Sequence, residues 1–302
     1  MLEFVEIPEP RTVRAADGRI VGYYAFGDPQ GTPVVALHGT PACGAGYAWA
    51  DERARARGIR LLAPDRPGVG KSAPWRLGRA PVVADYAPAL AAFADALDLE
   101  QFSLLGYSGG APYALHGAHA LAGRVHAAAI VSGAGHVGVW ASIDEFEASD
   151  RALTRLSERA PVLARATLML SAYGARFAPK TSARFAQVEM IDADRAVMAK
   201  FPSARAALAV FSQSCLHGAG GVVDDYAILG RPWGFAVEEI TVPIHCWHAT
   251  ADKVVPIHHT HELVHRIPGA QLTSWVDEGH LAIVDRVGEV FDTLAQYAPP
   301  RG

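Results

Sequence analysis

The chain has 302 residues, 50% of them hydrophobic and 19% charged, which is enough to bury a sizeable core in one large domain or in one domain with an insertion. Its net charge of −4 and pI near 6.3 lack the basic footprint expected for binding to nucleic acid or to an anionic membrane. Three scattered cysteines, no run near the roughly 18–20 apolar residues of a membrane span, and an N-terminus unlike a signal peptide together predict a cytoplasmic protein.

The first 135 residues alternate between strand and helix patterns. Residues 12–28 are predicted to form two strands joined at Asp17-Gly18, a dipeptide that favours tight hairpins. Residues 86–99 have the periodicity of a helix with one apolar face. Short, almost wholly apolar runs, typical of strands buried on both faces of a parallel sheet, occur at 34–37, 59–63, 102–105 and 127–131. This alternation predicts a layered α/β fold.

The alternation stops after Ser132, and residues 136–235 show helices and loops without a clear strand. Ser142 and Glu145 have the spacing of a capping box, which predicts a helix that begins there and ends at Glu158.

Beyond that capping box, a second helix is predicted over residues 203–216. Strand patterns return at 242–249 and 271–277, with helices near 258–266 and 281–297. We therefore predict an α/β core of residues 1–135 and 236–302 that is interrupted by a helical cap of residues 136–235.

The segment Gly106-Tyr107-Ser108-Gly109-Gly110 fits the pattern G-x-S-x-G, with an apolar strand before it and a helix-compatible run after it. This context is typical of a nucleophile elbow, where a tight turn exposes a serine hydroxyl at the end of a strand. The following helix directs its N-terminal N–H groups toward the position where negative charge develops. Ser108 is the predicted nucleophile.

A serine nucleophile needs a base and a carboxylate that orients the base. His280 and Asp252 each follow a predicted strand, and the chain order Ser108, Asp252, His280 is the one that accompanies this motif. Asp277 is a competing acid, for which a role in a turn is favoured.

The tetrahedral intermediate needs two N–H donors, for which we predict the backbone of Gly109 and of Thr40. Thr40 belongs to His38-Gly39-Thr40-Pro41, which directly follows an early strand, and the His38 ring is predicted to brace this loop.

These motifs together resemble the α/β-hydrolase fold superfamily over nearly the whole chain. The resemblance implies an eight-stranded, mostly parallel sheet flanked by helices, with a helical cap between the sixth and seventh strands. Among subfamilies, the chain is similar to the capped esterase, lactonase and proline-iminopeptidase-like group. The matching segments are 38–41 (HGTP), 65–72 (DRPGVGKS), 106–110 (GYSGG), Asp252 before Val255-Pro256, and Gly279-His280.

We therefore expect a cofactor-independent serine hydrolase that cleaves a small-to-medium, largely apolar ester, lactone or thioester through an acyl-serine intermediate. Epoxide hydrolases and haloalkane dehalogenases of this fold have aspartate at the elbow, so Ser108 disfavours both activities. Thr40-Pro41 stands where proline iminopeptidases usually have extra glycines, and no acidic cluster that would hold a substrate amine is evident in the cap.

An aminopeptidase, a C–C bond hydrolase with the same triad, and a ligand-binding protein on a hydrolase scaffold remain the alternatives. We expect a small-molecule substrate, without nucleic acid or membrane as a partner, and the oligomeric state stays open. Candidate pocket residues, each of which also fits a packing role, are His38, Gly39, Cys43, Tyr107, Trp140 and Trp233, with Phe146, Phe177 and Phe211 as further cap aromatics.

The segment His261-Glu262-Leu263-Val264-His265 matches H-E-x-x-H, the helical signature of zinc proteases. A zinc site needs a third ligand, which the sequence does not supply nearby. In the predicted fold this helix flanks the sheet, away from the strand ends where ligands bind. We expect no metal in the active site, with adventitious binding at His258, His259 and His261 as the alternative.

Overall fold

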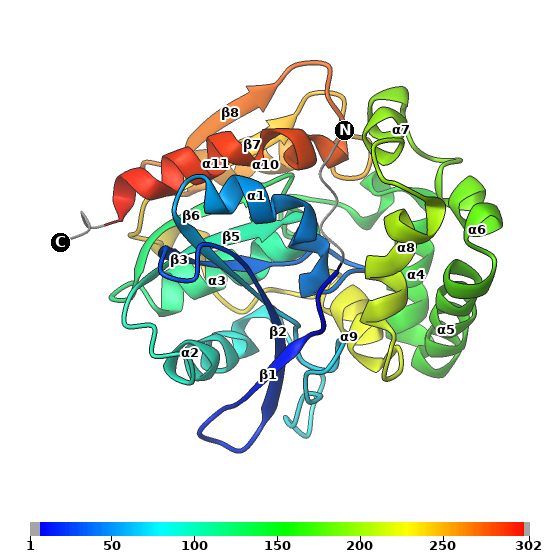
Figure 1. The fold of residues 1–302 in the computed structure, drawn as a ribbon, viewed down its shortest axis with the longest axis horizontal. Helices are drawn as coiled ribbons and strands as arrows, with labels where there is room; N and C mark the ends of the chain where they lie inside the picture. Colours follow the sequence, from blue (N-terminus) through cyan, green and yellow to red (C-terminus); the bar gives the residue numbers. More distant parts are fainter. Residues whose placement is uncertain (1–6, 299–302) are drawn as a thin grey trace.

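The protein is built around one eight-stranded sheet with the order β1-β2-β4-β3-β5-β6-β7-β8 (Figure 1). A computed structural model describes residues 7–298. The antiparallel pairs β1·β2 and β2·β4 form one end of the sheet, and every pair from β3·β4 onward is parallel. The strands are β1 Arg11–Arg14, β2 Ile20–Gly27, β3 Thr32–Leu37, β4 Ile59–Pro64, β5 Phe102–Tyr107, β6 Val125–Val131, β7 Ile244–Ala249 and β8 Gln271–Trp275.

Helices cover both faces of this sheet, as the continuous apolar strand runs predict. Helices α1 (Asp51–Arg55) and α11 (Ile283–Tyr297) contribute to the hydrophobic core on one face. Helices α2 (Ala87–Asp95), α3 (Ala111–Ala120) and α10 (His258–Arg266) pack against the opposite face. The predicted α/β fold with a mostly parallel eight-stranded sheet is therefore confirmed.

Six further helices lie between β6 and β7 in the chain and gather beside the sheet, on the right in Figure 1. They are α4 Ala148–Arg159, α5 Pro161–Phe177, α6 Pro179–Ala186, α7 Asp192–Met198, α8 Ala204–Ser214 and α9 Gly220–Leu229. We call this group the cap. No helix of residues 7–298 is both long and apolar enough to cross a membrane.

The predicted helix from Ser142 to Glu158 is partly wrong. The capping box forms, because Ser142 N–H donates to Glu145 Oε2 at 2.7 Å and Asp144 N–H donates to Ser142 Oγ at 3.2 Å. It closes only a single 3₁₀ turn, after which Phe146 and Glu147 have extended backbone and α4 begins. This extended step places the Phe146 side chain at the cavity beside Ser108.

Candidate active site

Ser108 stands at a tight turn directly after β5, with a backbone φ of 53°, in the left-handed region. The turn leaves no room for side chains at the two flanking glycines of the motif. A Cβ on Gly106 would lie 2.6 Å from Ala114 Cβ, and one on Gly110 would lie 2.1 Å from Leu37 O. The motif therefore has a steric cause: only glycine lets β5 turn this sharply into α3 and present the serine hydroxyl.

The structure brings Ser108, His280 and Asp252 into one hydrogen-bonded series, and all three are buried. His280 Nε2 lies 3.0 Å from Ser108 Oγ, and His280 Nδ1 lies 2.7 Å from Asp252 Oδ2. The Nδ1–H group donates to the carboxylate, which leaves Nε2 as the acceptor for the serine proton. The other oxygen of Asp252 accepts the N–H groups of Val254 and Val255, each at 2.9 Å, so the acid itself is fixed.

Two opposing effects set the charge on this series. Burial alone would lower the pKa of His280, but the Asp252 carboxylate outweighs it and raises the pKa above its ordinary value. Burial alone would raise the pKa of Asp252, but His280, with His248 at 3.4 Å, lowers it well below its usual range. The carboxylate thus remains ionised at neutral pH and stabilises an imidazolium when one forms.

Asp194, on cap helix α7, forms hydrogen bonds to the backbone of the loop that carries His280. Its carboxylate accepts the N–H of Leu281 at 2.8 Å and that of His280 at 3.2 Å. A Cβ on Gly279 would lie 2.5 Å from Asp194 Oδ1, so the loop and the carboxylate are in close contact. No role for Asp194 follows from the sequence, because the contact joins residues 86 positions apart. Through these two hydrogen bonds Asp194 connects the cap to the loop that carries His280.

Thr40 and Gly109, the predicted oxyanion donors, both line a narrow cavity of about 20 Å³ at Ser108. The two residues are so close that a Cβ on Gly109 would lie 2.8 Å from Thr40 Oγ1. The loop after β3 and the start of the turn into α3 therefore come together beside Ser108.

A buried arginine, Arg66, holds the Thr40 loop in place. Its guanidinium donates to the carbonyl oxygens of His38 and Gly39 and, at 2.9 Å, to Thr40 Oγ1. Asp225 on cap helix α9 compensates the charge with contacts of 2.7–3.0 Å. Neither side chain of this ion pair has appreciable contact with water. With its carbonyls tied to Arg66, the loop is held in one conformation beside Ser108.

The role of Arg66 does not follow from its motif alone, because its partner lies 159 positions away in the cap. The available signal is Asp224-Asp225 within the otherwise apolar run of α9. A buried carboxylate requires a compensating charge or hydrogen bonds. Tyr113 completes the network: its hydroxyl donates to Asp225 Oδ1 at 3.2 Å, and its ring lies 4.8 Å from the Arg66 guanidinium carbon.

His38 braces its loop, as predicted. Its Nδ1–H donates to Gly39 O at 2.8 Å, and its Nε2 accepts the Arg66 N–H at 3.2 Å. Both ring nitrogens of His38 therefore form hydrogen bonds to the backbone. Burial and the neighbouring Arg66 charge lower the pKa of His38 well below its ordinary value, which keeps the ring neutral.

A second, larger cavity of about 160 Å³ is lined by His38, Gly39 and Tyr107, which lie next to Ser108. Gly39 touches Ser108, since a Cβ there would lie 3.7 Å from the serine Oγ. The remaining lining comes from core and cap and is mostly apolar, and includes Tyr47, Trp49, Met198, Phe201, Val210 and Leu281. We call it the apolar cavity.

Three residues predicted to line the pocket, Cys43, Trp140 and Trp233, line neither of the two cavities. Cys43 is fully buried, with Sγ 3.5 Å from Val210 O, and lines neither cavity. Trp233 has no exposed surface because it stacks on His136 with ring centroids 4.7 Å apart, and Trp140 packs edge-on against it. Size and aromatic character favour burial as strongly as pocket lining, and here packing prevails.

The further cap aromatics separate into three environments. Phe146 lines the narrow cavity, Phe211 packs half-buried against the core, and Phe177 lies on the outer surface of the cap. The competing acid Asp277 is exposed in a turn with φ of 58°, and its N–H donates to Thr250 Oγ1. It does not contact His280.

The cap brings more acidic groups to the site than its sequence suggests. Asp150 lines the narrow cavity with Ser108, and Tyr226 donates a hydrogen bond to it at 2.8 Å. Burial, together with the charges of Glu189 and Asp150, raises the pKa of Glu147 to about 7. The sequence gives no sign of an acidic cluster in the cap, yet the fold brings Asp150 to the narrow cavity, with Glu147 close enough to interact with its charge.

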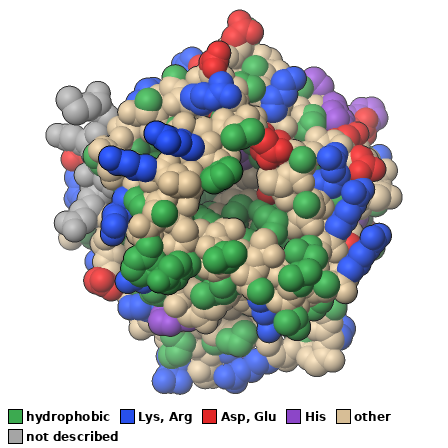
Figure 2. All heavy atoms as spheres, turned by 90° about the vertical axis from the view of Figure 1, so that its right-hand side faces the viewer, with side chains coloured by type: hydrophobic (Ala, Val, Ile, Leu, Met, Phe, Trp, Pro, Cys, Tyr) green, Lys and Arg blue, Asp and Glu red, His purple; other side chains and the backbone are tan. Residues whose placement is uncertain are grey.

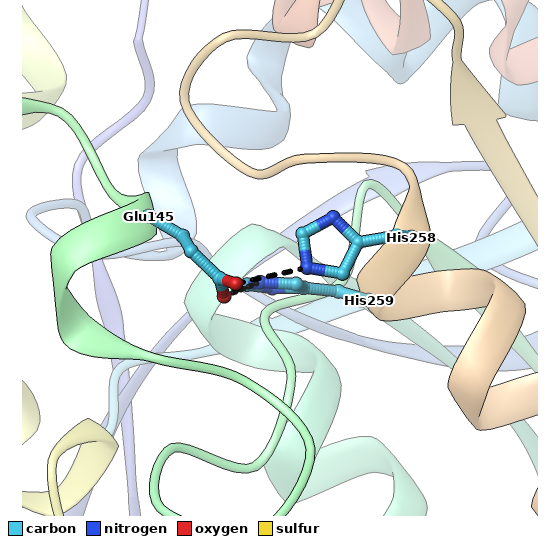
Figure 3. Close-up of side chains that lie close together, drawn as sticks. All are labelled: Glu145, His258 and His259. Atoms are coloured by element: carbon cyan, nitrogen blue, oxygen red, sulfur yellow. Dashed lines mark hydrogen bonds and ion pairs between the residues drawn. The ribbon is translucent and has the colours of Figure 1, made fainter.

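Glu145, His258 and His259 form a separate cluster where the segment leading into the cap meets α10 (Figure 3). His259 Nε2 lies 3.0 Å from one Glu145 oxygen and His258 Nε2 lies 3.3 Å from the other. The Gly135 N–H donates to His259 Nδ1 at 3.2 Å, so Nε2 carries the proton of a neutral ring and donates to Glu145. A metal ion would need that same nitrogen, so the cluster is better suited to fastening the cap to α10.

The H-E-x-x-H segment lies on α10, as predicted, with His261 and His265 exposed. Glu262 pairs with Arg266 at 3.6 Å. Within residues 7–298, the three-residue cluster of possible metal ligands contains neither His261 nor His265. The zinc-protease pattern therefore has no site built around it in this part of the chain.

A family model described as alpha/beta hydrolase fold matches residues 32–287, and the chain belongs to this family. The chain is 36% identical over 124 residues to a non-heme chloroperoxidase from Streptomyces lividans. That match covers 40% of this chain and spans less than half, 44%, of the relative.

Solved structures show the same fold over nearly the full length. An alpha/beta hydrolase fold protein from Nakamurella multipartita has a TM-score of 0.68 at 26% identity, covering 96% of this chain and 98% of that one. An esterase from Exiguobacterium antarcticum has a TM-score of 0.66 at 20% identity, covering 95% and 98%. These likenesses confirm the fold class, and the reaction has to be inferred from the site.

Proposed function

We propose that the chain is a cofactor-independent serine hydrolase in which Ser108, His280 and Asp252 form the catalytic triad. The observation that carries this proposal is the hydrogen-bonded series from Ser108 Oγ to His280 Nε2 at 3.0 Å and from His280 Nδ1 to Asp252 Oδ2 at 2.7 Å. The strained backbone at Ser108 supports it, because such strain persists where it serves a function.

In the proposed reaction, Ser108 Oγ attacks the substrate carbonyl carbon while His280 Nε2 takes the serine proton. The carbonyl oxygen becomes an oxyanion, which the N–H groups of Thr40 and Gly109 stabilise; each such donor is worth about 10²–10³ in rate. His280 then returns the proton to the leaving group, and an acyl-serine remains. Water, deprotonated by His280, attacks this ester and releases the carboxylic acid and the free serine.

The narrow cavity at Ser108 and the apolar cavity beside Gly39 support a largely apolar substrate of small to medium size. The apolar cavity of about 160 Å³ is lined by aromatic and aliphatic side chains, which suit an acyl or alkyl group. The narrow cavity is more restricted and carries one acidic group, Asp150. An ester, lactone or thioester with one bulky apolar substituent best matches one large apolar cavity beside one narrow cavity.

A second candidate, an aminopeptidase or amino-ester hydrolase on the same triad, is favoured by the acidic groups of the cap. Asp150 lines the narrow cavity, and Glu147 lies near enough to Asp150 for the two charges to interact. A substrate ammonium group placed beside Ser108 would find a carboxylate there.

The test is a substrate panel measured on the wild type and on Ser108→Ala. The panel holds 4-nitrophenyl esters of increasing acyl length, aliphatic lactones, acyl thioesters, aminoacyl 4-nitroanilides and a vinylogous diketone for C–C cleavage. Halide oxidation by hydrogen peroxide is measured in parallel because of the partial likeness to a chloroperoxidase. We expect the highest kcat/KM on apolar esters, and a loss of at least about 10⁴-fold in Ser108→Ala.

Two results would change the proposal. Preference for the aminoacyl anilides would move the assignment to the second candidate. A folded wild type that turns over no member of the panel, yet binds apolar ligands, would instead indicate a binding protein on a hydrolase scaffold.

A further inference from the structure

The outward face of cap helix α5 is more hydrophobic than the face that holds it to the protein. Four small or aliphatic residues, Ala164, Leu168, Ala172 and Ala175, form the buried face. Six large hydrophobic side chains point the other way and are between 42% and 79% exposed: Val162, Leu163, Met169, Leu170, Tyr173 and Phe177. At about 100° per residue these six fall within an arc of roughly 120°, opposite the buried face. A helix face meant for water is normally polar.

Exposed hydrophobic side chains also occur beyond α5, in the segment that follows it. The rings of Tyr173 and Phe177 contact each other, with centroids 4.3 Å apart. Phe185 on α6 and Val188 just after it are 76% and 71% exposed. Figure 2 shows hydrophobic side chains gathered on this side of the molecule, over the cap and around a hollow in the surface. We call the eight side chains the cap apolar face.

The helical segment that carries most of the cap apolar face is rich in basic side chains, and acidic residues occur only at its two ends, at Glu158 and Glu189. From Arg159 to Val188 the sequence contains five basic and no acidic side chains, although the whole chain has a net charge of −4. The Arg176 guanidinium lies 5.6 Å from the Phe177 ring centre, at the edge of the face. In the described part of the chain, none of the five cations has an ion-pair partner. They are Arg159, Arg165, Arg176, Lys180 and Arg184.

We propose that the cap apolar face docks onto an anionic phospholipid bilayer. Exposed aromatic and aliphatic side chains flanked by Lys and Arg are what a helix needs to lie in the headgroup region, with its apolar side at the acyl boundary. The unpaired cations supply attraction to anionic headgroups. Docking onto a membrane departs from the expectation that the protein has no membrane partner. That expectation rests on the net charge of the whole chain, −4, which does not reveal a short basic segment.

Charge also decides against a second copy of the chain as the occupant. A two-fold symmetric contact through this face would bring the two basic segments, including Arg176 of each copy, close together. Such like-charge juxtaposition opposes association, whereas an anionic bilayer neutralises both the charge and the exposed apolar surface.

The experiment measures binding of the full chain to sedimenting vesicles of equal parts phosphatidylglycerol and phosphatidylcholine, and to vesicles of phosphatidylcholine alone. The test variant is Leu170→Ser/Tyr173→Ser/Phe177→Ser. The matched control is Val276→Ser, which removes an equally exposed hydrophobic side chain from the core domain. Because these side chains are exposed, thermal melting should be unchanged in both variants.

A second pair of variants tests the charges. Arg176→Gln/Lys180→Gln removes two cations beside the face, and Arg11→Gln/Arg14→Gln removes two exposed cations from β1 as the control.

We expect the wild type to bind the anionic vesicles at low salt and to be released by high salt. The triple variant should bind at least about tenfold more weakly, and the double charge variant should lose about fivefold per charge. Both controls should bind like the wild type.

Three outcomes would overturn the proposal. They are absence of wild-type binding to anionic vesicles at low salt, binding that the triple variant retains in full, and a concentration-dependent dimer of the free protein that the triple variant dissolves. The last outcome would assign the face to a second copy of the chain.

Discussion

Asp225→Asn should damage both stability and catalysis, although Asp225 does not touch the proposed substrate. The substitution keeps the shape of the side chain and removes the charge that compensates the fully buried Arg66. Breaking a buried ion pair in this way costs about 3 kcal/mol. With an unfolding entropy of about 2.1 cal/mol/K per residue, that loss lowers the Tm of a 302-residue protein by about 5 °C.

The expected loss of activity follows from the contacts of Arg66 with the loop of residues 38–40. Its guanidinium binds the carbonyls of His38 and Gly39 and the hydroxyl of Thr40, so a displaced arginine releases the loop that carries one oxyanion donor. Loss of one donor costs about 10²-fold in rate. We expect kcat to fall about 100-fold with little change in KM, measured on the best ester of the substrate panel.

Asp292→Asn is the matched control, because Asp292 pairs with Arg57 at a similar distance, 2.7 Å, but at the surface. An exposed pair of this kind contributes at most about 1 kcal/mol, so Tm should change by less than 2 °C and kcat should not change. The double variant Arg66→Met/Asp225→Leu should recover stability without recovering kcat, since it removes the buried charges but also the loop contacts. A Tm and a kcat for Asp225→Asn within error of the wild type would refute the assigned role of this ion pair.

Four further predictions concern the proposed triad and its surroundings. Because Asp252 raises the pKa of His280 and the base must be neutral, kcat/KM should fall with decreasing pH through a pKa above the ordinary value of 6.5; an acid limb below 6.5 would contradict this. Asp194→Asn removes a carboxylate that also raises the pKa of His280, so its pH profile should shift to lower pH, and an unshifted profile would limit Asp194 to a structural role. Gly110→Ala would put a Cβ 2.1 Å from Leu37 O, so the variant should be strongly destabilised and inactive; a thermal melt and activity like those of the wild type would show that the turn can relax. Dialysis against a chelator should leave esterase activity unchanged, because both ring nitrogens of His259 in the Glu145–His258–His259 cluster are used in hydrogen bonds; lost activity that zinc restores would contradict that assignment.

Local patterns, together with the family resemblance that they carry, predict the sheet and the three residues that the structure joins by hydrogen bonds. The central strands appear as apolar runs, and Ser108, Asp252 and His280 each follow a predicted strand, so the parallel sheet brings them to one edge. The G-x-S-x-G motif also predicts its own geometry, because steric crowding at Gly106 and Gly110 permits nothing larger.

Contacts between the cap and the core could not be predicted in the same way. Asp225 and Asp194 reach Arg66 and His280 from helices far along the chain, and no periodicity encodes which acidic residue will turn inward. For Trp233, hydrophobicity predicts burial but not whether the burial is in the core or around a cavity. The capping box at Ser142 was recognised correctly, yet the length of the element it caps depends on tertiary contacts.

The central claim, that Ser108 is an activated nucleophile, is tested most directly by labelling with a fluorophosphonate probe and locating the adduct by mass spectrometry. A serine hydroxyl reacts with such a probe when a neighbouring base accepts its proton, as His280 Nε2 at 3.0 Å is placed to do. We predict stoichiometric labelling of Ser108, and none in Ser108→Ala or in His280→Ala. A folded wild type that stays unlabelled, or that is labelled at another serine, would contradict the account.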